Sequence, residues 1–256
     1  MEAPLPRIRT LRLADISLDS ELIAGGKGGC GSELDLEVVP FYFPGHSDLW
    51  HERLSSGPLG NFWLSPVTVS LGGVSGHFAT SEAAYQAMKW WTNPDARRQF
   101  QDAKDGEQAF ELKLKWEASN PPGPTWSNVA SLGPDGGDRV ALIDKWTAML
   151  VVLEAKFSDP SLRSALLSTG SALLLEHNSE PGRDAFWSDD HDGSGANHLG
   201  RALMFLRRRF AQEAGTATEC DAWPAGLDPQ SQEWRALLCR VCAMVNAAES
   251  ANASKL

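Results

Sequence analysis

The sequence predicts an α+β protein in which helices predominate. Short runs typical of strands gather before residue 80, and most later segments carry the apolar spacing of helices. Hydrophobic residues make up 42% of the 256 residues, enough for a sizeable core. The length suits one large domain, or one domain with extensions.

Strands are predicted in three regions. Residues 1–40 alternate weakly on both sides of AGGKGGCGSE, which indicates two strands joined by a flexible loop. AGGKGG lacks the GxxxxGK[ST] spacing of a phosphate-binding loop, so a flexible turn is the better interpretation. The run GNFWLSPVTVSLGGVSGHFATSE predicts a strand, a Gly-Gly turn and a second strand, and SALLLEHN predicts a buried strand.

Helices are predicted over the remaining periodic segments. The first begins after Thr80 and Ser81 and ends at Thr92-Asn93-Pro94. The others are PDARRQFQDAKDGEQAFELKLKW, RVALIDKWTAMLVVLEAKFS, PSLRSALLSTG, RALMFLRRRFAQEAG and one amphipathic helix within 215–256. Residues 119–138 are rich in Pro, Gly and Ser, which predicts an exposed loop.

Composition limits the class of partner. The net charge of −10 and the pI of about 5.1 argue against an extended basic surface for nucleic acid. Recognition of one nucleotide in a pocket remains open. No basic stretch precedes an apolar run at the N-terminus, and no apolar run reaches about 18 residues, so no membrane span is expected. We expect an intracellular protein, cytoplasmic or nuclear, in a reducing environment.

Two of the four cysteines form a C-x-x-C pair. Cys239 and Cys242 lie within EWRALLCRVCAMVNAAE, which has the pattern of a helix. No second such pair and no H-x-x-x-H accompanies them. Packed thiols are therefore favoured over a zinc or redox site.

The stretch ATSEAAYQAMKWW gathers polar groups on one helix face. With Glu82 as zero on a helical wheel, Lys89 lies at about −20°, Gln86 at about +40° and Tyr85 at about −60°. An acid, an amine, an amide and a phenol on one narrow face indicate a site. The alternative is a buried Glu–Lys pair with a satisfied Gln that locks helix packing, and spacing alone does not choose between the two.

A second polar cluster is DAFWSDDHDGSGANHLGRALM. Asn197 can cap the helix that follows it, and Gly193 and Gly195 allow backbone to approach a ligand closely. A helix start behind such a loop is suited to anions. The alternative is a surface loop with a capped helix. The acidic run 189–192 lacks calcium-loop spacing, so we predict no metal site.

Several motifs, in order and spacing, resemble the NADAR family, whose bacterial members are called YbiA-like. They are FYF, GNF, TSEAAYQAMKW, DKWTAML, AKFSDPSLRSALLSTG, LLLEHN and RDAFWSDDHDGSGANHLGRALMFLR. The resemblance implies a single compact, mainly helical α+β domain with a deep ligand cleft over 41–210. Residues 1–40 would then be an N-terminal extension, 119–138 a loop insertion, and 211–256 a linker and C-terminal helix.

The resemblance also implies hydrolysis of an N-glycosidic bond at C1 of a ribose, without a cofactor. The substrate it favours is ADP-ribose attached to guanine in DNA or RNA. The alternatives are phosphorylated ribosylamino-pyrimidine intermediates of riboflavin synthesis, or, in another class, a non-catalytic ADP-ribose reader. Retention of Glu82 and Lys89 weighs against the reader.

Site residues follow from the same motifs. The resemblance implies catalytic roles for Glu82, Lys89 and Asp184. It implies ligand binding by Asn61, Phe62, Tyr85, Gln86, Trp146, Trp187, Gly193, Gly195 and Asn197. The chain departs from the family pattern at three positions, which are Gly60 in place of Ser, Ala83 in place of His, and Ser188 in place of Gly.

Overall fold

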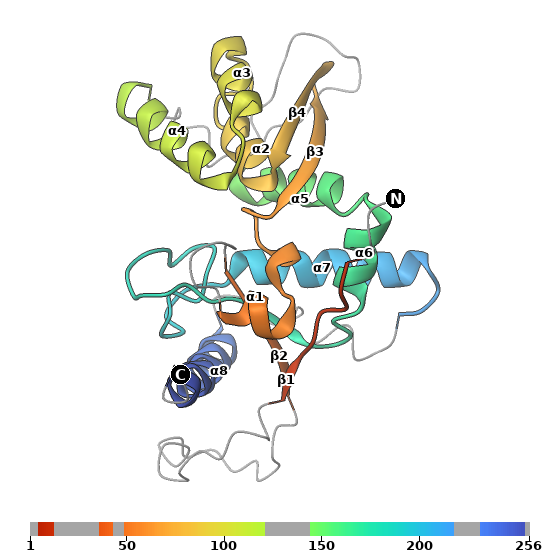
Figure 1. Cartoon of the computed structure of the whole chain (residues 1–256), viewed down its shortest axis with the longest axis vertical. Coiled ribbons are helices and arrows are strands. Elements are labelled where there is room, and N and C mark those ends of the chain that lie inside the picture. The colour runs from red at the N-terminus through yellow and green to blue at the C-terminus, as the bar shows by residue number, and fades with distance from the viewer. Residues whose placement is uncertain (1–4, 13–35, 43–48, 121–143, 218–230, 254–256) are drawn as a thin grey trace. The chain divides into compact units, whose positions relative to one another are not determined.

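The computed structural model describes residues 5–12, 36–42, 49–120, 144–217 and 231–253 (Figure 1). It confirms the α+β class with helices in the majority. No helix in these ranges is both long and apolar enough to cross a membrane. The chain divides into two compact units, the first built on Gly57–Leu166 and the second on Pro6–Tyr42, Ser47–Ser56 and Leu167–Leu256.

The first unit is a β-hairpin covered by helices (Figure 1). Strand β3 (Leu64–Leu71) pairs antiparallel with β4 (Val74–Thr80). The turn between them uses Gly72 and Gly73 at φ 61° and 75°, a region that glycine enters without steric cost. The predicted strand–Gly-Gly–strand order is therefore confirmed. Alternate residues of β3 are buried, so one face of the hairpin supports the helices.

Six helical segments complete the described part of this unit. They are η2 (Gly57–Leu59), α2 (Ser81–Met88), α3 (Pro94–Asp102), α4 (Gly106–Ser119), α5 (Lys145–Lys156) and α6 (Pro160–Leu167), the last ending at the boundary with the second unit. The helical segment predicted after Pro94 is two helices. Ala103 is extended, with ψ 127°, and Asp105 then caps a new helix by accepting from the Gln108 amide.

The second unit contains a three-stranded sheet in the order β1-β2-β5. Strand β1 (Leu11–Arg12) is antiparallel to β2 (Glu37–Phe41), and β2 is parallel to β5 (Leu173–Glu176). The three leucines of β5 are fully buried, which confirms the buried strand predicted from SALLLEHN. Strands buried on both faces suit a parallel pair.

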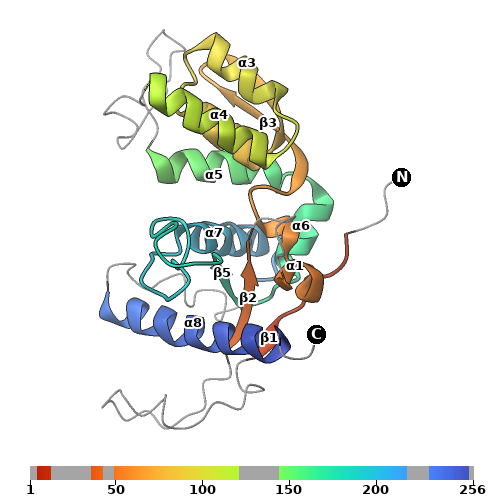
Figure 2. The ribbon, with the colours of Figure 1, turned by 60° about the vertical axis from the view of Figure 1, so that its left-hand side comes forward.

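In the described residues of this unit, three helices accompany the sheet: α1 (Leu49–Leu54), α7 (His198–Glu213) and α8 (Gln232–Ala253). Figure 2 shows α7 and α8 on opposite sides of β2 and β5. Helix α8 confirms the predicted C-terminal helix. The predicted loops around AGGKGG and 119–138 lie almost wholly outside the described residues, as do Cys30 and Cys220. The predicted division at 40 and 210 remains a prediction.

Candidate active site

The start of α2 brings an acid and an amide together in the interior. Gln86 Nε2 donates to Glu82 Oε1 at 2.7 Å, across one helical turn. Both residues are buried, with 7% and 6% of their surface exposed. Thr80 Oγ1 caps the helix by accepting from the Ala83 amide, and Glu82 lies in the first turn, where the helix dipole stabilises an anion. The shared face predicted for Glu82 and Gln86 is present.

A loop from η2 meets this helix at the same place. The Glu82 amide donates to the main-chain oxygen of Asn61 at 3.0 Å. The Asn61 side chain is also buried, and its Nδ2 points at the sulfur of Met149, a weak acceptor, at 3.5 Å. Asn61 and Glu82, predicted as a ligand-binding and a catalytic residue, are therefore held side by side by the backbone.

Two acceptor oxygens at this place have no partner. Gln86 Oε1 and Asn61 Oδ1 are buried and accept no hydrogen bond from any described residue. The Ser81 hydroxyl is also buried and has no hydrogen-bond partner among the described residues. An unmet buried polar atom costs about 1–3 kcal/mol, so each of these oxygens would gain from a donor on a bound ligand or water. Carbonyl oxygens only accept, which makes a hydroxyl-bearing ligand the chemical complement.

Lys89 follows the last turn of α2. The helix ends at Met88, earlier than predicted, and the Lys89 amide donates to Gln86 O in a tightened turn. Its Nζ pairs with Glu117 of α4 at 2.7 Å. Burial is the main influence on this amine and lowers the pKa of Lys89 despite the charge of Glu117. Sequence reasoning missed Glu117 because it lies on another helix, 28 residues away.

The aromatic residues predicted to bind ligand in this unit differ in exposure. Tyr85 is buried in α2, and Trp146 is partly exposed at the start of α5. The Phe62 ring covers Gly106, where a Cβ would lie only 2.4 Å from Phe62 Cγ. Phe62 therefore has a packing role, and ligand contact by these three rings remains a prediction.

The second unit carries the remaining predicted residues. Asp184 Oδ1 accepts from the amides of Phe186 at 2.9 Å and Trp187 at 2.8 Å, so this acid shapes the turn that presents Trp187. The Trp187 and Phe186 rings meet edge to face, and Phe186 lies 4.4 Å from His198 between ring centroids. Sequence reasoning did not identify Phe186 and His198 as neighbours of Trp187.

The predicted glycines make close contacts with the protein itself. A Cβ on Gly193 would lie 2.6 Å from the backbone of Cys239 in α8, and one on Gly195 would lie 2.4 Å from Ser188 O. These close contacts explain why both positions are glycine, and no ligand is needed for that explanation. Their role in ligand binding remains a prediction.

Asn197 precedes α7, as predicted, but does not cap it. Its backbone is in the left-handed region, with φ 51°, and its side chain makes no capping hydrogen bond. Its Nδ2 instead donates to Leu174 O and its Oδ1 accepts from the Glu176 amide, which ties the loop to β5.

Residues 188–190 are buried, so the cluster is not a simple surface loop. The amides of residues 196–199 donate to main-chain oxygens of 185–188, so in this conformation they are engaged and do not present an anion site.

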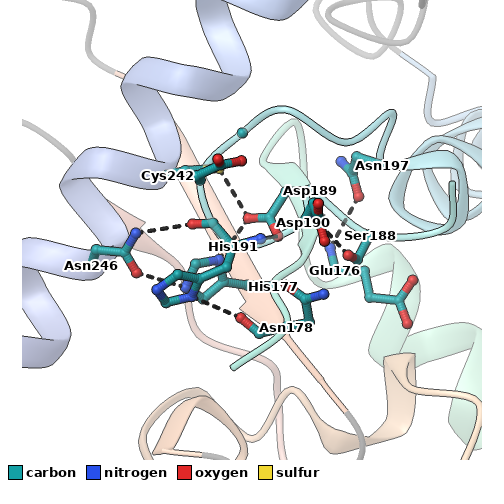
Figure 3. Close-up of polar contacts among 12 residues, drawn as sticks. Glu176, His177, Asn178, Ser188, Asp189, Asp190, His191, Asn197, Cys242 and Asn246 are labelled. Carbon is teal, nitrogen blue, oxygen red and sulfur yellow. Dashed lines mark hydrogen bonds and ion pairs between the residues drawn. The ribbon is translucent and has the colours of Figure 1, made fainter. Parts of the chain in front are cut away.

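A buried network joins this loop to α8 (Figure 3). Asp189 Oδ2 accepts from His177 Nδ1 at 2.6 Å and from Cys242 Sγ at 2.9 Å, while Oδ1 accepts from the His191 amide. Asn246 accepts from His177 Nε2 and donates to His191 O. Cys242 and Asn246 of α8 therefore meet polar groups of the loop and of His177, which follows β5.

The charge states follow from the contacts. Burial acts to lower the pKa of His177, but the hydrogen bond and charge of Asp189 outweigh it and hold that pKa above its ordinary value. Burial and Asp189 raise the pKa of the Cys242 thiol far above its usual range, so the thiol stays protonated and donates. Cys242 is packed as predicted, whereas Cys239 is exposed.

Among the described residues, His177, Asp189 and Cys242 also have the chemistry of metal ligands, with donor atoms within 4.8 Å of one another. Their mutual hydrogen bonds already satisfy these atoms and explain why they converge. We therefore interpret the cluster as a structural network that attaches α8 to the loop.

Comparison with known proteins finds relatives in sequence and in structure. No family model matches the chain. The N-glycosidase YbiA of Escherichia coli (strain K12) is 29% identical over 158 residues, which are 61% of this chain and 83% of that protein. The solution structure of the E. coli protein YbiA superimposes with a TM-score of 0.51 at 28% identity, covering 71% of this chain and 89% of that one.

The chain is similar to YbiA proteins in both sequence and fold. The resemblance predicted from its motifs is thereby confirmed. A second relative is larger: the riboflavin biosynthesis protein VVA0006 of Vibrio vulnificus (strain YJ016) is 32% identical over 163 residues. That match is 62% of this chain but 36% of the relative, so the chain spans about a third of its length.

Proposed function

We propose that this protein hydrolyses an N-glycosyl bond at C1 of a ribose, and that its substrate is ADP-ribose attached to guanine in DNA or RNA. The reaction class is supported by relatives named N-glycosidase, because the match to this chain covers 83% of the length of each. The observation that carries it is the buried Glu82–Gln86 pair beside Asn61, with two amide oxygens unmet.

Glu82 has the chemistry that the reaction needs. Breaking a ribosyl C–N bond builds positive charge on C1 and the ring oxygen, and a fixed carboxylate stabilises that charge and orients a water. Gln86 Nε2 donates to the Glu82 side chain, and Glu82 lies in the first turn of α2, near the positive end of the helix dipole. In this proposal Glu82 acts through its charge or as a general base.

The unmet oxygens of Gln86 and Asn61 supply recognition. Ribose hydroxyls are donors, and each would satisfy a buried acceptor that is otherwise unpaired. A substrate without these hydroxyls would leave both oxygens unmet, so the site should discriminate strongly against it. The net charge of −10 fits a single modified nucleotide entering a pocket, not a duplex bound along its length.

The second candidate substrate is a phosphorylated ribosylamino-pyrimidine of riboflavin synthesis. It is favoured by the matches to proteins named for riboflavin biosynthesis, including PYRR of Arabidopsis thaliana, 40% identical over 76 residues. Both substrates present a ribose C1–N bond to Glu82. They differ in the leaving group and in the number of phosphates.

The two substrates are tested in parallel incubations, one with an ADP-ribosylated guanine oligonucleotide and one with the ribosylamino-pyrimidine phosphate. We expect release of ADP-ribose to be the faster reaction. Faster turnover of the pyrimidine would assign the second function. Binding of ADP-ribose with no turnover of either substrate would indicate a reader.

Lys89 provides a test of the type of catalysis. Released ADP-ribose opens to an aldehyde at C1, and a lysine amine adds to it with loss of water to give an imine. Because burial lowers the pKa of Lys89, more of this amine is unprotonated near neutral pH than in an exposed lysine. Borohydride added during turnover should then reduce the imine to a stable secondary amine on Lys89, detected by peptide mass analysis.

Arginine variants give the control. Lys89→Arg keeps the charge but should abolish both the adduct and the activity. Lys113→Arg, which changes the other lysine paired with Glu117, should change neither. An active Lys89→Arg enzyme with no adduct in the wild type would leave Lys89 an electrostatic role only.

A further inference from the structure

Lys156 is a buried lysine with no carboxylate partner among the described residues. It lies at the end of α5 with 1% of its surface exposed. Its Nζ donates to the main-chain oxygen of Gly60 at 2.7 Å and lies 5.3 Å from the centroid of the Phe157 ring. Burial alone lowers the pKa of this amine to about 7. An apolar residue would fill this place at lower cost, so packing does not explain a lysine.

The contact leads directly to the candidate active site. Gly60 precedes Asn61, whose main-chain oxygen accepts from the Glu82 amide. Helix α5 also contacts the next residue of the same loop, because the Asn61 side chain lies against Met149 of α5. Residues 149 and 156 are two turns apart on one face of α5, so this helix holds the loop at two points.

We propose that Lys156 is a positioning residue for the reaction proposed above: its amine fixes Gly60, so that Asn61 presents its free oxygen and Glu82 keeps its place at the start of α2. The inference rests on the proposed function for its kinetic consequence. Its structural consequence, a tighter Asn61–Glu82 contact, is measurable without any substrate.

Lys156→Met keeps the length and apolar body of the side chain and removes the donor. We expect kcat to fall roughly tenfold to a hundredfold, the effect of a small displacement of a reacting group, with a much smaller change in KM. We also expect amide hydrogen exchange at Glu82 to accelerate about tenfold, because its acceptor on Asn61 is no longer fixed. Exchange at Ala109, buried in α4 of the same unit, should not change.

The control is Lys104→Met, an exposed lysine of the first unit, which should alter neither measurement. Lys156→Leu also removes the donor and carries the same test if Lys156→Met does not fold. A folded variant with wild-type kcat and unchanged exchange at Glu82 would overturn the proposal. Equal acceleration at Glu82 and Ala109 would also overturn it, because that result indicates general loss of stability.

The two proposals fail in different ways. A wild-type protein inactive on both substrates would refute the proposed function. Exchange at Glu82 in the Lys156 variants would still decide whether this lysine positions the loop. An active wild type with an unaffected Lys156→Met variant would refute the positioning role alone.

Discussion

Glu82→Gln should lower turnover at least about 100-fold, the usual scale for removal of one preorganised electrostatic group. The substitution keeps the shape of the side chain, and its amide oxygen can still accept from Gln86 Nε2. What disappears is the negative charge that faces the developing charge on C1. The variant should therefore unfold at the same urea concentration as the wild type and bind ADP-ribose with similar affinity.

The matched control is Glu111→Gln, an exposed acid on α4 of the same unit. It should retain full activity. Near-normal turnover of Glu82→Gln would remove Glu82 from the mechanism and return the Glu82–Gln86 pair to a role in helix packing.

The largest effect on stability is expected from Asp189→Asn. This substitution places an amide where His177 and Cys242 both donate, so at least one buried donor loses its acceptor. Breaking a buried charge pair by changing one partner costs about 3–5 kcal/mol. Urea unfolding should show a loss of this size, with α8 released from the loop 189–193 that it contacts.

The loss should also depend on pH. Because the pKa of His177 is raised in the folded protein, its pairing stabilises the fold fully below the unfolded value of about 6.5 and is lost as pH rises through the folded value. The difference between wild type and Asp189→Asn should therefore be larger at about pH 6 than at about pH 9. Asp192→Asn, an exposed acid in the same loop, should change stability by less than about 0.5 kcal/mol at either pH. A pH-independent difference would contradict the assigned His177–Asp189 pairing.

The sequence predicts local features of the site well. The Gly-Gly turn, the Thr80 cap and the shared helix face of Glu82 and Gln86 each depend on residues within a few positions of one another, where periodicity and capping rules apply. The break between α3 and α4 was missed although it is local. Its signal was present in Asp105, a capping residue in the middle of a segment assigned to one helix.

Contacts between distant residues could not be predicted in this way. Glu117 beside Lys89 and Gly60 beside Lys156 are set by how helices pack, and no local pattern encodes a partner 28 or 96 residues away. Asn197 shows the same limit in a different form. Its position before α7 predicts a cap, but its side chain instead bonds to β5, a partner more than 20 residues earlier.

The most direct test of the central claim is the mass of both fragments released from an oligonucleotide that carries one ADP-ribosylated guanine. The proposed cleavage between ribose C1 and the base predicts an oligonucleotide with its original guanine restored, together with intact ADP-ribose. An oligonucleotide that keeps phosphoribose would show that the diphosphate was cleaved. An abasic oligonucleotide would show that a different glycosidic bond was broken, and either product would contradict the account.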